Sequence, residues 1–201
     1  MQTIDSIIFD LGRVLVNWYP YQYMVQVFGE EIASALHESI FSVKEAALLD
    51  RGEMSEDEIW QIRLKRYPEY APYIEHMKDK ILDLLTPIEE NVNLIPELKR
   101  KGYKLYVLSN FSKQAFDAIY SKYGFFTYFD GLVISSHHHT VKPEKKIYEV
   151  LIQEHGVAPE TSVFIDDREE NIATAQKLGF HVIHLEQPSL LKQKLEVMNI
   201  L

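Results

Sequence analysis

Residues 7–13 have the sequence IIFDLGR, in which three apolar residues run directly into an aspartate. Ile7, Ile8 and Phe9 lack the alternation of apolar and polar residues that marks a half-exposed strand. A short apolar run rich in β-branched residues is typical of a strand that is buried on both faces of a parallel sheet. We therefore expect a first strand that ends at Asp10.

Four more apolar runs of strand length follow, and segments with helical periodicity separate them. These runs are residues 104–108, 132–134, 163–165 and 181–185. Pro143 is expected to open one helix and Gly156 to follow its last turn, while Gly102 and Gly179 mark the ends of others. The alternation of helices and strands predicts a doubly wound, Rossmann-like α/β fold, in which right-handed crossovers join parallel strands.

The stretch from residue 17 to residue 86 has a different character. It is rich in Tyr and Glu, and no convincing strand interrupts it. Residues 55–58, SEDE, match a capping box, which predicts that a helix starts at about Ser55. We therefore expect a helical cap over residues 17–86, inserted into an α/β core formed by residues 1–16 and 87–201. Such an insert can cover a site at the end of the first strand.

Composition limits the classes of function. The chain has 201 residues, enough for one domain with a smaller insert. Its 21 Lys and Arg against 30 Asp and Glu give a net charge of -9, which disfavours binding to nucleic acid. The absence of Cys excludes disulfides and thiolate catalysis. With no membrane-spanning run and no signal peptide, we expect a cytoplasmic monomer or small homo-oligomer.

Polar residues follow four of the expected strands. Ligands of a parallel sheet bind beyond the carboxyl ends of its strands, so these residues are expected to meet. They are Asp10, Ser109, Asn110, Lys142, Asp166 and Asp167. Each alone has a simpler explanation, as a turn residue, a helix cap or an exposed lysine. Together they include three carboxylates, and two such charges 4 Å apart repel by about 4 kcal/mol at an effective dielectric near 20. The cluster therefore needs a cation, and oxygen ligands favour Mg²⁺ over Zn²⁺.

The four segments that carry these residues, taken in chain order, resemble the four motifs of the haloacid-dehalogenase-like superfamily. Members of that superfamily are mostly Mg²⁺-dependent phosphatases. The resemblance covers the whole chain, because the helical insert lies where that superfamily has a C1-type cap. Residues 51–55, RGEMS, and 163–167, VFIDD, are most similar to the branch of sugar-1-phosphate phosphatases and the N-terminal phosphatase domain of epoxide hydrolases. The resemblance implies a phosphomonoesterase acting on a small phosphorylated metabolite, such as a sugar phosphate of the glucose 1-phosphate type.

The resemblance also implies roles for individual residues. Asp10 would attack phosphorus and form an aspartyl-phosphate. Mg²⁺ would be held by Asp10, the main-chain carbonyl of Gly12 and Asp167, with Asp166 as a further ligand or as a residue that orients the site. The phosphoryl oxygens would be bound by Ser109, the backbone around Asn110, and Lys142. Arg13, Asn17 and Trp18 are expected near the entrance, where they could contact substrate.

One position departs from the family pattern. Most phosphatases of this superfamily have a second Asp two residues after the nucleophile, which acts as general acid and base, and here that residue is Gly12. General acid–base catalysis contributes about 10²–10⁴-fold. The loss of this general acid favours a substrate with an acidic leaving oxygen, such as an anomeric hydroxyl. Alternatively, water or the cap supplies the acid.

Two other functions remain open from the sequence. A 2-haloacid dehalogenase uses the same Asp attack, on carbon and without a metal, but Asp166 and Asp167 would repel its carboxylate substrate. A non-catalytic protein that binds phosphate or metal is suggested by Gly12. The run His137-His138-His139 is a weak candidate for a metal site, because three successive residues cannot all face one ion in an extended loop.

Overall fold

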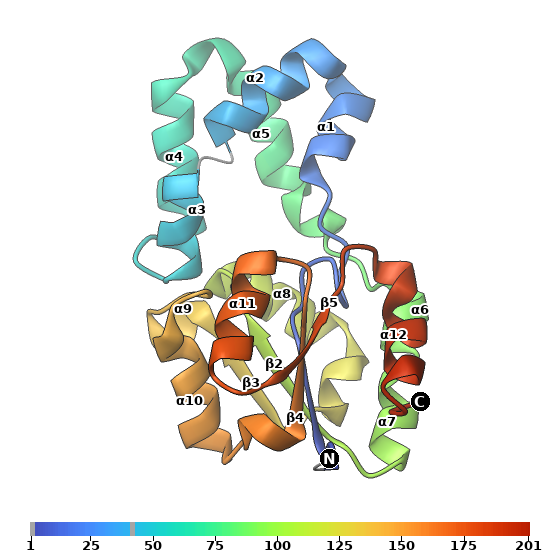
Figure 1. Cartoon of the computed structure of the whole chain (residues 1–201). Coiled ribbons are helices and arrows are strands. Elements are labelled where there is room, and N and C mark those ends of the chain that lie inside the picture. Colours follow the sequence, from blue (N-terminus) through green and yellow to red (C-terminus); the bar gives the residue numbers. More distant parts are fainter. Residues whose placement is uncertain (1–2, 41–42) are drawn as a thin grey trace.

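The computed structural model describes residues 3–40 and 43–201, and within them five strands form one parallel sheet (Figure 1). The strands are β1 (Ser6–Phe9), β2 (Lys104–Ser109), β3 (Gly131–Ile134), β4 (Ser162–Asp166) and β5 (His181–His184), in the order β3-β2-β1-β4-β5. Phe9 of β1 is in register with Val107 of β2 and Ile165 of β4. The end of β1 therefore lies between the ends of its two neighbours, at the point where the strand order reverses. The prediction of a doubly wound α/β sheet is confirmed.

Helices cover both faces of this sheet, and they explain the unbroken apolar runs of the strands. On one face, Ile7 and Phe9 pack with residues of α6 (Glu89–Val92), α7 (Ile95–Arg100), α8 (Lys113–Lys122) and α12 (Leu191–Val197). On the other face, Ile8 and Phe164 pack with residues of α10 (Lys145–His155) and α11 (Glu169–Lys177). A short helix, α9 (Ser135–His138), follows β3. Alternate residues of each strand thus face two different hydrophobic clusters.

The expected start of α10 is corrected by the structure. Pro143 does not open the helix; it lies in a turn in which the backbone N–H of Glu144 donates to the carbonyl of Val141, 2.9 Å away. Glu144 is then the N-cap, and the helix begins at Lys145. The expected end is confirmed, because Gly156 follows the helix with a φ of 64°, in the left-handed region that glycine adopts without strain.

The first part of the segment between β1 and β2, up to about residue 86, is helical and lies over the carboxyl edge of the sheet (Figure 1). It contains α1 (Pro20–Phe28), α2 (Glu30–Ile40), α3 (Val43–Asp50), α4 (Glu56–Arg66) and α5 (Ala71–Lys80), with short 3₁₀ turns at Pro68–Tyr70 and Ile81–Leu84. Met24, Trp60 and Met77 belong to a hydrophobic cluster of its own. Where the chain enters and leaves the segment, Val16 pairs with Pro87 in an isolated antiparallel bridge. We propose that this bridge marks the limits of the cap, at residues 16/17 and 86/87.

The capping box at Ser55 is confirmed. The backbone N–H of Glu58 donates to Ser55 Oγ (3.3 Å), and the backbone N–H of Ser55 donates to Glu58 Oε2 (2.9 Å). Ser55→Ala is expected to lower the free energy of unfolding by about 1 kcal/mol, measured by urea denaturation. Ser112→Ala is the matched control, because Ser112 is the N-cap of α8 but makes no side-chain capping bond. Equal losses of unfolding free energy in the two variants would contradict a stabilising role of the capping box.

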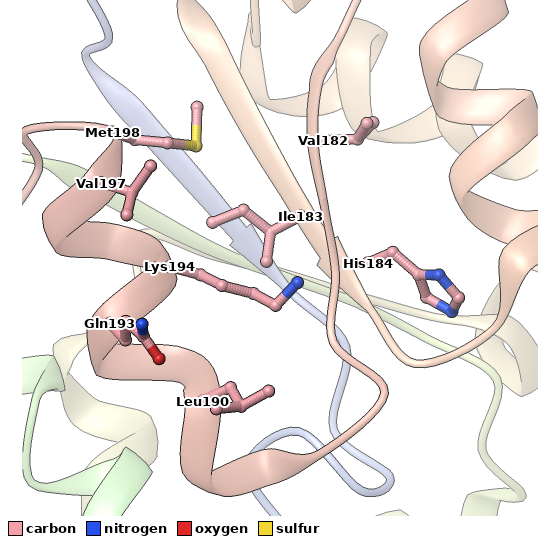
Figure 2. A pocket seen from close by; sticks show the side chains of 8 residues that line it. All are labelled: Val182, Ile183, His184, Leu190, Gln193, Lys194, Val197 and Met198. Atoms are coloured by element: carbon pink, nitrogen blue, oxygen red, sulfur yellow. The ribbon is translucent and has the colours of Figure 1, made fainter.

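A hollow of about 430 Å³ lies between β5 and α12, away from the predicted site residues. Figure 2 shows Ile183 of β5 facing Lys194 and Val197 of α12 across it. In the part of the chain that the structure describes, none of the helices has the length and apolar character needed to cross a membrane.

Candidate active site

The ends of β1 and β2 bring Asp10 and Ser109 into direct contact. Asp10 follows β1, and its backbone N–H donates to the carbonyl of Ile165 on β4 (2.9 Å), so the parallel ladder continues to this residue. Ser109 is the last residue of β2, and its Oγ donates to Asp10 Oδ1 at 2.6 Å. Both residues are buried. The strand register therefore fixes the position of the Asp10 carboxyl.

Lys142 is buried between two carboxylates. Its Nζ lies 2.9 Å from Asp10 Oδ1 and 2.6 Å from Asp166 Oδ2, and only 1% of its side chain is exposed. Burial opposes the charge on Lys142, but Asp10 and Asp166 outweigh this effect and hold its pKa above the ordinary value. The ammonium is therefore charged at neutral pH.

Asn110 positions the segment that carries Lys142. The backbone N–H of Lys142 donates to Asn110 Oδ1 (2.7 Å), and Asn110 Nδ2 donates to the carbonyl of Lys142 (2.9 Å). These two reciprocal bonds join the end of β2 to the loop before α10. The Asn110 side chain is thus occupied with backbone groups of the core, although the residue also lines the pocket described below.

Ser109 Oγ and Lys142 Nζ both contact the same oxygen of Asp10, Oδ1. Burial raises the pKa of Asp10 to about 6; Lys142 acts in the opposite direction, and Asp166 adds to the rise. A buried carboxylate that water solvates poorly is suited to nucleophilic attack.

Asp166 is fully buried, and both of its carboxylate oxygens accept hydrogen bonds. Oδ1 accepts from the backbone N–H of Arg168 and from Asn171 Nδ2, each at 2.9 Å. Oδ2 accepts from Lys142 Nζ at 2.6 Å and from Asn171 Nδ2 at 3.1 Å. Of the two roles expected for Asp166, orienting its neighbours fits this arrangement better than metal ligation.

Asp167 lies beside Asp166 and is paired with Arg13. Arg13 Nη1 is 3.3 Å from Asp167 Oδ2, and the Arg13 side chain is 45% exposed. Burial raises the pKa of Asp167, Asp166 raises it further, and Arg13 acts in the opposite direction. The pair places Arg13 at the edge of the site, where sequence reasoning expected it.

The three carboxylates meet the geometric requirement of a metal site. Asp10, Asp166 and Asp167 offer oxygens that all lie within 4.8 Å of one another. The cations near them include the buried ammonium of Lys142 and the guanidinium groups of Arg13 and Arg168. A cluster of hard carboxylate oxygens suits Mg²⁺. Asp10 and Asp167 fit as ligands, since the oxygens of Asp166 are already hydrogen-bonded.

A pocket of about 500 Å³ opens above these residues, between the sheet and the helical segment. Its base contains Asp10, Gly12, Lys142 and Asp167. Much of its wall is apolar and comes from both parts of the chain: Trp18, Ala46, Leu49, Trp60, Ile81, Leu82, Leu85, Phe111 and Ala115. The site therefore combines a charged base with a largely apolar wall.

The remaining candidates from the sequence lie elsewhere. Asn17 does not line the pocket; its Nδ2 donates to Thr86 Oγ1 (3.0 Å), because the chain crosses between core and cap here. The three histidines face three different partners. His137 packs against the ring of Phe116, His138 lies 3.6 Å from a carboxylate oxygen of Glu154, and His139 Nδ1 lies 2.8 Å from the carbonyl of Arg51. They do not converge on one ion.

Sequence reasoning missed several residues of the site, of which three bear most on its chemistry. Asn171 holds Asp166, and Asp50 and Arg63 line the pocket from the cap. Arg63 is buried, and its guanidinium carbon lies 4.6 Å from the centre of the Trp60 ring. Burial lowers the pKa of Arg63 to about 10, although Glu45 opposes this effect. A signal existed for Asp50, because it directly precedes the RGEMS segment that supported the family resemblance.

Several curated proteins are similar to this chain, and three of them bear on its function. A drimenol cyclase of Aspergillus calidoustus is 26% identical over 90% of this chain but only 34% of its own length. A sesquiterpene phosphatase of Aspergillus oryzae is 25% identical over 91% of this chain and 90% of its own. A D-ribitol-5-phosphate phosphatase of Bacteroides thetaiotaomicron is 31% identical over 49% of this chain and 50% of its own.

Solved structures and a family model agree with the fold. A haloacid-dehalogenase-family enzyme of Bacteroides thetaiotaomicron, crystallised with magnesium and inorganic phosphate, superposes with a TM-score of 0.70 at 21% identity, covering 90% of this chain and 93% of its own. The family model for haloacid dehalogenase-like hydrolases matches residues 7–185, from the second residue of β1 to just beyond β5. The chain therefore belongs to the haloacid dehalogenase-like hydrolase family.

Proposed function

We propose that this hydrolase removes the phosphoryl group from a small phosphomonoester. The observation that carries the proposal is the arrangement around Asp10. A buried carboxylate contacts Ser109 Oγ and Lys142 Nζ through Oδ1 and lies in a carboxylate cluster with Asp167. Phosphoryl transfer needs chiefly positioning and charge neutralisation, and this set supplies both. The full-length match to a relative named as a phosphatase supports the same reaction.

In the proposed reaction, Asp10 attacks phosphorus and the bond from phosphorus to the leaving oxygen breaks. The product of this step is an aspartyl-phosphate on Asp10, which water then hydrolyses. Ser109 Oγ and Lys142 Nζ hold the Asp10 carboxyl and can donate to phosphoryl oxygens beside it. Asp166 and Asn171 keep Lys142 in place. Preorganised donors of this kind stabilise charge that develops in the transition state.

We propose Mg²⁺ as the cofactor, held by Asp10, Asp167 and the main-chain carbonyl of Gly12. The carboxylate cluster supports this proposal, as does the related Bacteroides enzyme that was crystallised with magnesium. When bound, Mg²⁺ supplies positive charge beside the phosphoryl oxygens. Asp166 contributes by orienting Lys142, and Arg13 by pairing with Asp167.

Two substrate classes fit the pocket. A sugar phosphate is our first candidate, on the resemblance to sugar-1-phosphate phosphatases, and one relative is named for the phosphate of a sugar alcohol. The wall formed by Trp18, Leu49, Trp60, Ile81 and Phe111 favours a second candidate, the phosphate ester of an apolar alcohol. The relative named as a sesquiterpene phosphatase supports this second class. In both, the phosphoryl group lies at the charged base of the pocket.

Phosphate release from a panel of substrates tests the proposal. The panel contains sugar phosphates, a prenyl phosphate and an aryl phosphate. We expect release that EDTA abolishes and added Mg²⁺ restores, because the carboxylate cluster needs a cation to accept a phosphoryl group. Halide release from 2-chloropropionate that survives EDTA would instead establish a dehalogenase. Mg²⁺ binding by calorimetry without turnover of any substrate would establish a non-catalytic protein.

A further inference from the structure

Asp50 is a carboxylic acid that the cap presents to the pocket over Asp10. It is the last residue of α3 and lines the same pocket as Asp10, Lys142 and Asp167. We infer that Asp50 is the general acid and base of the reaction. It would replace the Asp that most phosphatases of the superfamily have where this chain has Gly12. This inference rests on the proposed phosphomonoester hydrolysis and names a residue for its proton transfers.

Gly12 leaves the space beside the nucleophile open. A Cβ built at Gly12 would meet no atom within 4 Å, and Gly12 itself lines the pocket. Glycine is therefore not required there by a close contact. A leaving group or a water molecule can approach Asp10 at this side, but no proton donor comes from position 12.

The segment that follows Asp50 makes an ion pair and a hydrogen bond to the core, next to the loop that carries Lys142. The guanidinium of Arg51 pairs with Glu144, with Nη1 3.2 Å from Oε2. The carbonyl of Arg51 lies 2.8 Å from His139 Nδ1. Gly52 has a φ of 64°, and a Cβ there would lie 2.6 Å from the carbonyl oxygen of Ser136, so this close approach of two backbones requires glycine. The core thus holds the end of α3 in place.

The other acids that line the pocket have a proposed role or a bonding partner of their own. Among the described residues of its lining, the acids are Asp10, Asp50, Glu56 and Asp167. Asp10 is the proposed nucleophile, and Asp167 pairs with Arg13. Glu56 Oε1 accepts the backbone N–H of Ala115 at 3.3 Å. Asp50 is the acid that remains for proton transfer.

The charges around Asp50 support this role. Burial raises the pKa of Asp50 to about 7, and the negative charges of Asp10 and Glu56 add to the rise. Lys142 and Arg168 act in the opposite direction. A carboxyl group that titrates near neutral pH can both donate a proton and take one back.

The two steps then balance. In the first step, Asp10 attacks phosphorus, the bond to the leaving oxygen breaks, and the Asp50 proton moves to that oxygen to give the alcohol. In the second step, water attacks the phosphorus of the aspartyl-phosphate, and its proton moves to the Asp50 carboxylate. The bond between Asp10 and phosphorus breaks, hydrogen phosphate leaves, and both aspartates return to their starting states.

Asp50→Asn tests the inference through its dependence on the leaving group. With a simple alkyl phosphate, kcat is expected to fall by about 10²-fold or more, because a poor leaving group needs a proton. With an aryl phosphate of acidic leaving group, the rate constant of the first step, measured as the initial burst of aryl product, is expected to fall less than about tenfold, because that leaving group needs no proton. For the wild type, kcat with the alkyl ester should decline as pH rises above neutrality, and Asp50→Asn should lack this decline. Asp50→Glu is expected to restore part of the alkyl activity.

Asp57→Asn is the matched control. Asp57 lies in the same cap, its side chain is 78% exposed, and it pairs only loosely with Lys78 at 3.5 Å. We expect wild-type rates with both esters. If Asp50→Asn remains folded by circular dichroism and slows the first step equally with both esters, or keeps wild-type rates with both, the inference on Asp50 is wrong while the phosphatase proposal stands. If the wild type releases no phosphate from either ester, the proposed function fails, and the inference on Asp50 fails with it.

Discussion

Asp10→Asn is expected to lower kcat for phosphate release by about 10⁴-fold or more, because an amide cannot act as the nucleophile. The fold should survive the change, since Asn retains an oxygen that can accept from Ser109 Oγ and Lys142 Nζ, as Asp10 Oδ1 does. Phosphate release with excess Mg²⁺ measures the effect on turnover. Residual activity within about tenfold of the wild type would contradict the role of Asp10.

The same variant should be more stable than the wild type when metal is removed. The pKa of Asp10 is raised from 3.8 to about 6 in the folded chain, so the unfolded chain loses this proton first. The stability of the metal-free wild type therefore decreases as pH rises between these two values, and the penalty is complete above about pH 6. Asn carries no such charge. We expect Asp10→Asn to raise the free energy of unfolding at pH 7 by on the order of 1 kcal/mol, measured by urea denaturation with EDTA.

Lys142→Met is expected to reduce both stability and activity. It removes a cation whose side chain is 1% exposed and leaves the buried carboxylates of Asp10 and Asp166 to face each other. Breaking a buried charge pair in this way costs about 3–5 kcal/mol, and protonation of one carboxylate recovers part of it at low pH. The loss of unfolding free energy should therefore grow as pH rises. Phosphate release should fall below detection, because the ammonium beside the phosphoryl site is gone.

Lys145→Met is the matched control for this prediction. Lys145 lies three residues further along the chain, its side chain is 66% exposed, and it pairs with Glu149 at 2.8 Å one helical turn away. Exposed pairs of this kind contribute less than about 1 kcal/mol. Urea denaturation of both variants at pH 5 and pH 8 separates the two cases. Equal stability of Lys142→Met and Lys145→Met at pH 8 would contradict the buried network.

The core of the site was predictable because the carboxyl ends of all strands in a parallel sheet lie at the same edge. Asp10, Ser109 and Asp166 each lie at the carboxyl end of a strand, and β1 lies between β2 and β4. Apolar runs located these strand ends directly. The reversal of strand order at β1 then brings their side chains together, so no knowledge of helix packing was needed to find them.

The cap was not predictable in the same way. Its helices were expected, and the start of α4 at Ser55 was located by its capping box. Periodicity, however, does not say how a helix lies over a sheet, so Asp50 and Arg63 were not recognised as pocket residues. Asn17 was placed at the site from its nearness in sequence to Asp10, but the chain turns away into the bridge between Val16 and Pro87.

Asn171 shows a similar limit within the core. It lies in the first turn of α11 and reaches back to both oxygens of Asp166. Its contribution depends on the rotation of that helix against the sheet, which is set by packing of Ile172 and Ala175 in the core. Local sequence shows an exposed-looking polar residue, whereas the tertiary structure makes it a buried hydrogen-bond donor.

A covalent phosphoryl group on Asp10 during turnover is the most direct test of the proposed chemistry. Wild-type enzyme with Mg²⁺ is mixed with an aryl phosphate, quenched in acid within the first turnover, digested and measured by peptide mass spectrometry. We expect a phosphoryl adduct on the peptide that contains Asp10, and none in Asp10→Asn. Release of the aryl product with that peptide unmodified, or an adduct on another residue, would contradict the role of Asp10 as nucleophile.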